Sequence, residues 1–171
     1  MSKYIIDTEK GTCQPYETPI APIAPNIVDF LGKYNGATEW DDVVSSIQKW
    51  FYGTLIKAPW CATCMSWVFN NLHIPVIKAE NVYALMQNCK NAANQGHGTF
   101  YSRSELPELK KGDVCFLLFE GSTMKFSSKK HVAAFIERPE AGCIRCIGGN
   151  QSGKIRVSDY ALSTLYAVYR P

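Results

Sequence analysis

The chain lacks a long hydrophobic segment, and this absence argues against a membrane-spanning helix. Its longest strongly apolar runs are Val114–Phe119 and His131–Ile136, whereas a spanning helix needs about 20 consecutive apolar residues. The N-terminus also lacks an apolar region of the kind found in signal peptides, because Asp7 and Glu9 interrupt it. We therefore expect a protein that is made in the cytoplasm, without a signal peptide and without a membrane span.

The chain also has little excess of either charge. It contains 18 basic and 15 acidic side chains, a formal net charge of +3, which is too small to indicate a nucleic-acid binder. Hydrophobic residues make up 46% of the chain and charged residues 19%, a balance typical of a folded protein rather than a disordered one. The sequence has no internal repeat and no long linker. Its 171 residues therefore predict a single domain, which we expect to be a monomer.

Proline is concentrated near the N-terminus, at positions 15, 19, 22 and 25. Proline fixes φ and removes a backbone donor, so the segment 1–25 is predicted to be an extended arm rather than a helix. The segment 26–171 then forms the single domain.

The first half of this domain has helical periodicity, and the second half has the patterns of strands. We predict helices at 26–33, 38–53, 61–72 and 80–93, with Thr38 as the N-cap of the second helix and Gly53 as its end. The third helix is apolar over most of its circumference and should be buried. Strands are predicted at 114–119, 130–137, 143–150, 154–157 and 164–170. Helices followed by a meander of antiparallel strands indicate an α+β fold with a small sheet.

Cysteine is the unusual part of the composition, with seven residues, four of which form two C-x-x-C pairs. Disulfide frameworks are rare in the cytoplasm, so catalysis, metal binding or packing is favoured. Cys61, Cys64, Cys143 and Cys146 add up to a four-thiolate zinc set. The second pair, however, has the pattern of an apolar strand, whereas a zinc site usually places such a pair in a tight turn. We therefore expect no metal and no cofactor.

Two interpretations of the first pair remain. Cys61 and Cys64 at the start of a helix suit a thioredoxin-like thiol–disulfide oxidoreductase, because a helix N-terminus lowers a thiol pKa and the second thiol can act as the resolving group. A thioredoxin-like fold would place a strand directly before the pair, but here a helix and a short loop precede it. The other interpretation is a nucleophilic Cys61, with Cys64 packed in the core.

A nucleophilic cysteine needs an imidazole as its base and a third group that orients the imidazole. Of the three histidines, His73 lies at a predicted helix end and His97 lies between glycines in a loop. His131 instead stands at the start of a strand. We therefore predict that His131 is the base.

The partner of His131 follows from the register of the predicted hairpin. A regular hairpin would pair Glu137 with Ile144, Phe135 with Cys146, Ala133 with Gly148, and His131 with Asn150. This register places an asparagine amide beside the imidazole, so that the cysteine, histidine and asparagine form a triad. A bulge near Gly148 or Gly149 would shift the register by one residue.

Four blocks of the sequence together resemble a known superfamily. The blocks are APWCATCMSWVFNNLHIP, LKKGDVCFLLF, KHVAAFIE and IGGNQS. From Asn26 to the C-terminus, the chain resembles the CHAP and NlpC-type cysteine peptidases and amidases, especially the peptidoglycan hydrolases of phage endolysins. The resemblance implies a papain-like fold in which the helix that carries the nucleophile packs on a small antiparallel sheet.

The resemblance also implies a role for particular residues. Cys61 would be the nucleophile and its backbone N–H would belong to the oxyanion hole. His131 would be the base and Asn150 the orienting residue. Glu137 and Gln151 are further candidates to support these groups.

The implied activity is cleavage of an amide bond in the peptide of peptidoglycan, as an endopeptidase or an N-acetylmuramoyl-L-alanine amidase. Such a protein would be an endolysin or an injected lytic effector that reaches the bacterial wall after release or injection. The chain departs from the family at Gly148, where many members have an acidic residue. The thioredoxin-like oxidoreductase and a catalytically dead module that binds the wall remain as alternatives.

Overall fold

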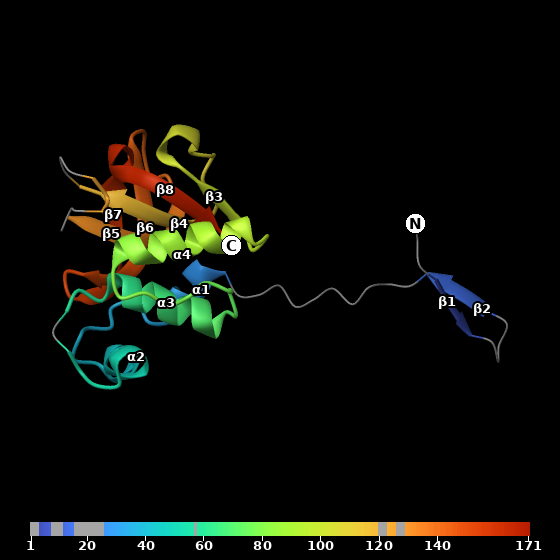
Figure 1. Cartoon of the computed structure of the whole chain (residues 1–171), viewed down its shortest axis with the longest axis horizontal. Coiled ribbons are helices and arrows are strands. Elements are labelled where there is room, and N and C mark those ends of the chain that lie inside the picture. Colours follow the sequence, from blue (N-terminus) through green and yellow to red (C-terminus); the bar gives the residue numbers. More distant parts are fainter. Residues whose placement is uncertain (1–3, 8–11, 16–25, 57, 120–122, 126–128) are drawn as a thin grey trace.

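The structure is a computed structural model that describes residues 4–7, 12–15, 26–56, 58–119, 123–125 and 129–171. In this part of the chain, four α-helices precede a six-stranded antiparallel sheet (Figure 1). The predicted α+β fold is therefore confirmed at this level. The papain-like arrangement that the resemblance implies stays a prediction.

Two of the helices are capped at the N-terminus by the side chain of the asparagine that precedes their first residue. Helix α1 (Ile27–Gly32) follows Asn26, whose side chain accepts a hydrogen bond of 2.8 Å from the Val28 N–H. Helix α4 (Val82–Asn94) follows Asn81, which accepts a bond of 2.9 Å from the Ala84 N–H. Such bonds satisfy backbone donors that have no partner inside the helix. Helix α3 (Cys61–Asn71) begins at the predicted residue.

Helix α2 (Asp42–Tyr52) begins later than the sequence pattern predicts. The backbone N–H and the hydroxyl of Thr38 both donate to Oδ2 of Asp41, at 2.6 and 2.9 Å, and the helix starts only after Asp41. Thr38 is therefore not the N-cap, because its local side-chain bonds form a turn that competes with the helix. The predicted end is confirmed, since Gly53 has the left-handed φ of 76° that glycine adopts without strain.

The six strands are arranged in the order β3-β8-β4-β5-β6-β7, with every pair antiparallel. Their bounds are β3 (Thr99–Tyr101), β4 (Val114–Leu118), β5 (Lys130–Glu137), β6 (Cys143–Gln151), β7 (Lys154–Ala161) and β8 (Leu165–Arg170). The meander from β4 to β7 was predicted. Strand β3 was not predicted, because three residues are too few to show a period of two.

Two strands near the N-terminus, β1 (Tyr4–Asp7) and β2 (Thr12–Pro15), pair as a separate two-stranded sheet. The sequence analysis predicted no strands in this segment. The prolines at positions 19, 22 and 25, on which the extended arm was predicted, lie outside the described residues.

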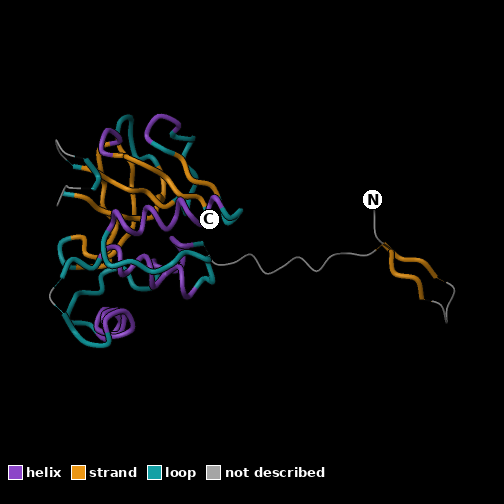
Figure 2. Tube along the Cα trace, viewed as in Figure 1, coloured by secondary structure: helices purple, strands orange, loops and turns teal. Residues whose placement is uncertain are grey.

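The helices cover one face of the six-stranded sheet (Figure 2). On this face, α3 is almost completely buried, with Met65 and Phe69 packed against the helix-facing side chains of the strands, such as Val132. The opposite face has a core of its own, which includes Cys115 and Phe135. Because β5 contributes alternate residues to both cores, it is buried on both faces.

Gly112 and Asp113 join three distant parts of the chain at the start of β4. Gly112 has a φ of 96°, and a Cβ at this position would lie 2.5 Å from the Asn26 side chain that caps α1. The buried carboxylate of Asp113 accepts two bonds from Arg170 on β8, at 2.8 and 2.7 Å, and a third of 2.8 Å from the Lys110 N–H. Side chains near the two ends of the domain, those of Asn26 and Arg170, therefore contact the residues that precede β4.

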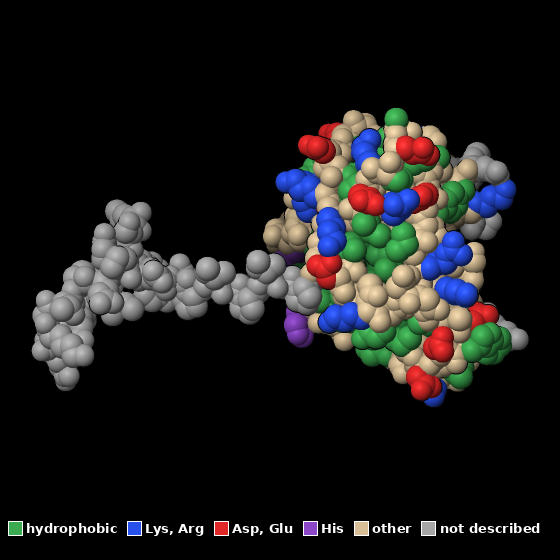
Figure 3. Space-filling view, turned by 180° about the vertical axis from the view of Figure 1, so that it is seen from behind, with side chains coloured by type: hydrophobic (Ala, Val, Ile, Leu, Met, Phe, Trp, Pro, Cys, Tyr) green, Lys and Arg blue, Asp and Glu red, His purple; other side chains and the backbone are tan. Residues whose placement is uncertain are grey.

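Lys, Arg, Asp and Glu side chains are interspersed on the face of the domain shown in Figure 3. This face carries no extended cationic zone of the kind that binds a nucleic-acid backbone. None of the helices in the described ranges has the length and apolar character to cross a membrane.

Candidate active site

Cys61 is the first residue of α3, where the backbone N–H groups of the first turn have no partner within the helix. Its thiol lies within hydrogen-bond reach of the N–H groups of Cys61 itself, of Ala62 and of Val132 on β5. Donors in this arrangement, together with the helix dipole, stabilise negative charge on a sulfur or on a substrate oxygen.

The pKa of the Cys61 thiol is nevertheless raised, because burial disfavours the thiolate more than the three N–H groups and the charge of Lys130 favour it. Cys61 is only 6% exposed. The resting sulfur is therefore protonated near neutral pH, and a base has to remove its proton as it attacks.

His131 is buried, whereas the other two histidines of the chain, His73 and His97, are exposed. It pairs with Leu117 across β4 and β5, and its ring centroid lies 5.9 Å from that of Tyr160 on β7. Burial lowers the pKa of His131 to about 4, and Nε2 has no hydrogen-bond partner. At neutral pH this imidazole is an uncharged base.

The structure brings Cys61 and His131 to the same end of β5, although no hydrogen bond joins the two side chains. The Cys61 thiol reaches the backbone of Val132, the next residue after His131. The pKa of Tyr160, whose ring contacts the His131 ring, is raised chiefly by burial, and negative charge on Cys146 and on Cys61 adds to this effect. The sulfur therefore lies where β5 and β6 separate, since their described pairing ends at Ala134 and Ile147.

Two successive glycines of β6 allow close contacts on opposite sides of the strand, Gly149 with the start of α3 and Gly148 with β5. A Cβ on Gly149 would lie 2.5 Å from Cβ of Cys64 and 2.6 Å from the Trp60 ring. A Cβ on Gly148 would lie 3.0 Å from Cβ of Ala133 on β5. The close approach of β6 to the start of α3 therefore depends on the absence of a side chain at Gly149.

Gly149→Ala should consequently destabilise the domain by about 1–3 kcal/mol, the usual cost of overpacking a core. Gly32→Ala is the matched control, because a Cβ there has nothing within 4 Å and φ is not in the left-handed region. The control should be neutral or slightly stabilising, by up to about 1 kcal/mol. Urea unfolding measures both variants, and equal stability of the two would contradict the close packing.

Cys64 lies one turn after Cys61 and is fully buried. Burial, reinforced by negative charge on Cys61, raises the pKa of Cys64 to about 12. Such a thiol is a poor resolving group near neutral pH, which argues against a redox pair. Cys143 and Cys146 lie apart from this pair on β6, and the described residues form no group of three His, Cys, Asp or Glu side chains suited to a metal ion.

Part of the predicted hairpin register is confirmed and part is wrong. Phe135 pairs with Cys146 as predicted, but Glu137 pairs with Arg145 rather than Ile144, because the register shifts between Phe135 and Glu137. The carboxylate of Glu137 forms an exposed ion pair of 2.9 Å with Arg145. The structure therefore places Glu137 at the far end of β5 from His131.

Asn150 does not contact His131 by a hydrogen bond in the described structure. It has a left-handed φ of 59° and lies in a bulge of β6, because the register with β7 shifts between Gly148 and Gln151. The predicted pairing of His131 with Asn150 is not formed. Asn150 instead lines a pocket beside Trp60, the residue before the nucleophile.

This pocket has a volume of about 800 Å³ and is lined by residues of α2 and of the chain segments directly before and after this helix. Trp40 and Leu55 expose 80% and 55% of their surfaces, so the pocket has apolar walls. Trp60 is buried in its base, and its Nε1 has no partner. The sequence analysis did not predict the pocket, because its walls come from irregular segments without a periodic pattern.

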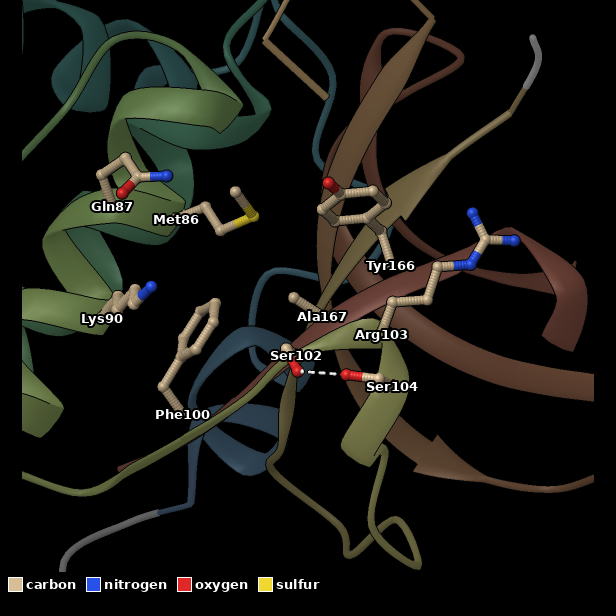
Figure 4. A pocket seen from close by; sticks show the side chains of 9 residues that line it. All are labelled: Met86, Gln87, Lys90, Phe100, Ser102, Arg103, Ser104, Tyr166 and Ala167. Atoms are coloured by element: carbon tan, nitrogen blue, oxygen red, sulfur yellow. Dashed lines mark hydrogen bonds between the residues drawn. The ribbon is translucent and has the colours of Figure 1, made fainter. Parts of the chain in front are cut away.

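A second pocket, of about 530 Å³, lies between α4 and the strands β3 and β8 (Figure 4). Its lining residues Ser102, Ser104 and Tyr166 carry hydroxyl groups, and those of the two serines are hydrogen-bonded to each other at 3.0 Å. Neither a cysteine nor a histidine is among its lining residues. Cys61 and His131 line neither pocket, but the pocket of about 800 Å³ includes Trp60, which directly precedes Cys61, whereas the second pocket has no lining residue next to Cys61 in the chain.

The low pKa of His131 makes the stability of the domain depend on pH. The unfolded chain binds a proton at His131 below about pH 6.5, whereas the folded protein does so only near 4. Stability should therefore be lost as the pH falls from about 6.5 to about 4, by about 3 kcal/mol in total. Urea unfolding at several pH values would measure this, and His131→Gln should reduce the loss. An equal loss in both proteins would assign it to other groups.

A scan against models of protein families gives no match for this chain, and a search of the curated proteins gives none either. The assignment of a function therefore rests on the residues described above.

Proposed function

We propose that the protein is a cysteine hydrolase that cleaves an amide bond in the peptide of bacterial peptidoglycan, with Cys61 as nucleophile and His131 as base. The observation that carries the proposal is the Cys61 thiol at the start of α3, within reach of three backbone N–H groups. A carbonyl bound there meets an attacking sulfur and donors for its developing negative charge. The choice of peptidoglycan rests on the resemblance of the four sequence blocks.

The reaction begins from a neutral thiol and a neutral imidazole. His131 accepts the thiol proton as the sulfur of Cys61 attacks the carbonyl carbon, and the carbonyl electron pair moves to oxygen. The backbone N–H of Cys61 donates to this oxyanion. His131 then protonates the amide nitrogen, the C–N bond breaks, and an acyl-thioester remains. Water attacks the thioester with His131 as base, which releases the acid and restores the thiol.

The pocket beside Trp60 is the proposed site for the substrate peptide. The exposed rings and alkyl groups of Trp40 and Leu55 would pack on apolar parts of the peptide. Glu39, which has no ion-pair partner among the described residues, would face a free amino group of the substrate.

The direct test is incubation of the purified protein with cell-wall sacculi. Amide cleavage should release new amino groups without new reducing sugar ends, and mass spectrometry of the fragments identifies the bond. Reduction of insulin that requires Cys64 would instead support the oxidoreductase. Binding to sacculi without any release would support the wall-binding module.

A further inference from the structure

The bulge in β6 changes which side chain stands beside His131. Gly148 pairs with Arg156 and Gln151 with Lys154, so two residues of β6, at positions 149 and 150, lie opposite one residue of β7. One extra residue reverses the alternation of side chains beyond it. Gln151 therefore returns to the face of the sheet on which Gly148 lies.

Distances to Gly148 show which face this is. An ideal Cβ on Gly148 would lie 3.0 Å from Cβ of Ala133 and 3.0 Å from Nε2 of Gln151. Alternate residues of a strand share a face, so His131 is on the same side of β5 as Ala133. Because β5 and β6 are antiparallel, Gln151 lies beyond Gly148 toward the His131 end of β5.

Nε2 of His131 and both polar side-chain atoms of Gln151 are buried without hydrogen-bond partners. Gln151 is 5% exposed and neither its Oε1 nor its Nε2 has a hydrogen bond, and Nε2 of His131 is unpartnered as well. Buried amides are almost always hydrogen-bonded, because an unpaired buried polar atom is costly. His131 and Gln151 therefore both carry unpaired buried atoms on the same face of the sheet as Ala133 and Phe135, opposite to the face that α3 covers.

We propose that Gln151, rather than Asn150, is the positioning residue that holds His131 for its attack on the Cys61 proton. This inference rests on the proposed function and assigns the third member of its site.

The proposed bond runs from the Nε2–H of His131 to Oε1 of Gln151. It fixes the tautomer in which Nε2 carries the proton, so that Nδ1 is the atom that accepts the proton of Cys61. It also gives the buried imidazolium an acceptor at the moment when charge forms. Hydrogen bonds of this kind are often long in the free enzyme and tighten in the complex with substrate.

Asn150 then has a different task. Its left-handed backbone and its place in the wall of the 800 Å³ pocket put it beside Trp60 rather than beside the imidazole. Asn150→Ala should therefore raise KM, while substitutions of Gln151 should lower kcat.

The first experiment compares Gln151→Glu with Asn150→Asp by NMR titration of His131 in the full chain. The other titratable groups near this ring are Tyr160 on β7, Cys61 on α3 and Lys130 on β5 itself, and both variants leave them in place. A carboxylate beside an imidazole raises its pKa, so Gln151→Glu should raise the pKa of His131 by more than about 1 unit. A larger rise in Asn150→Asp would overturn the assignment.

The second experiment uses Gln151→Leu, which keeps the approximate size of the side chain and removes its unpaired polar atoms. This variant should melt at a temperature equal to or higher than that of the unmodified protein, and its kcat should fall about 100-fold. In this variant the population of the Nε2–H tautomer of His131, measured from the chemical shifts of the imidazole nitrogens, should fall. A variant that melts earlier and keeps its kcat and tautomer would show that Gln151 has only a structural role.

The role of Gln151 and the proposed function can be rejected independently of each other. The NMR titration and the tautomer measurement need no turnover, so they decide the role of Gln151 even if peptidoglycan is not the substrate. An active enzyme whose His131 responds only to substitution of Asn150 would keep the proposed function and reject the inference.

Discussion

Cys61→Ala is expected to reduce the release of peptides from cell-wall sacculi by at least about 1,000-fold, because no other group can form the acyl-enzyme. In the structure the Cys61 sulfur occupies the start of α3 within reach of three backbone N–H groups, and alanine leaves these donors without a nucleophile. The measurement is the initial rate of amino-group release, with fragments identified by mass spectrometry.

Cys64→Ala is the matched control for this prediction. Cys64 is on the same helix, one turn further, and its thiol has a pKa of about 12 because it is fully buried. The variant loses a small buried group and should keep most of its activity, with a loss of stability of about 1 kcal/mol. An equal loss of activity in both variants would contradict the triad chemistry and favour the redox pair.

The second large effect is expected at Asp113, the buried carboxylate that joins β4 to β8. Asp113→Ala removes the acceptor of two bonds from Arg170 and of one from the Lys110 backbone. The carboxylate is 1% exposed, and loss of one partner of a buried ion pair costs about 3–5 kcal/mol. Urea unfolding monitored by tryptophan fluorescence measures the change.

An exposed ion pair provides the control. Nζ of Lys111 lies 2.6 Å from Oδ1 of Asp29, but the side chains of these residues are 50% and 57% exposed. Lys111→Ala should therefore cost no more than about 1 kcal/mol. The double variant Asp113→Ala with Arg170→Met should be less destabilised than the sum of its single variants, since neither charge is then left unpaired. Additive effects would show that the two side chains are not coupled.

Asp113 also explains a sequence block that the search for catalytic residues leaves without a role. The Gly-Asp pair before β4 is part of the resemblance to the cysteine peptidases. In the structure Gly112 allows close contact with the cap of α1, and Asp113 binds Arg170. This block therefore maintains the fold rather than supplying chemistry.

The sequence predicts the elements that have a clear period, and it predicts the position of the nucleophile. The start of α3 at Cys61 follows from the apolar positions of the helix, which tertiary packing reinforces. The antiparallel meander follows from alternating strands separated by turn residues. Residue types and spacing therefore predict that α3 begins at Cys61 and that His131 lies in a strand, and the structure confirms both positions. The pairing of their side chains stays a prediction.

The register of β6 could not be predicted, because it depends on one backbone conformation. Asn150 adopts a left-handed φ that asparagine tolerates better than most residues, and this creates the bulge. The sequence Gly-Gly-Asn permits the bulge but equally permits a regular strand. As a result, the residue that we propose to orient His131 is Gln151, one position after the Asn150 that a regular hairpin register would pair with it.

The position of β8 has a consequence for the order in which the domain can assemble on the ribosome. Strand β8 lies between β3 and β4, and among the strands that the structure describes it alone pairs with β3. A nascent chain that has emerged only as far as β7 therefore contains the nucleophile, the base and Gln151, but it lacks the strand that completes the sheet and the arginine that neutralises Asp113. The proposed activity should consequently arise only after β8 has been synthesised and has paired with β3 and β4.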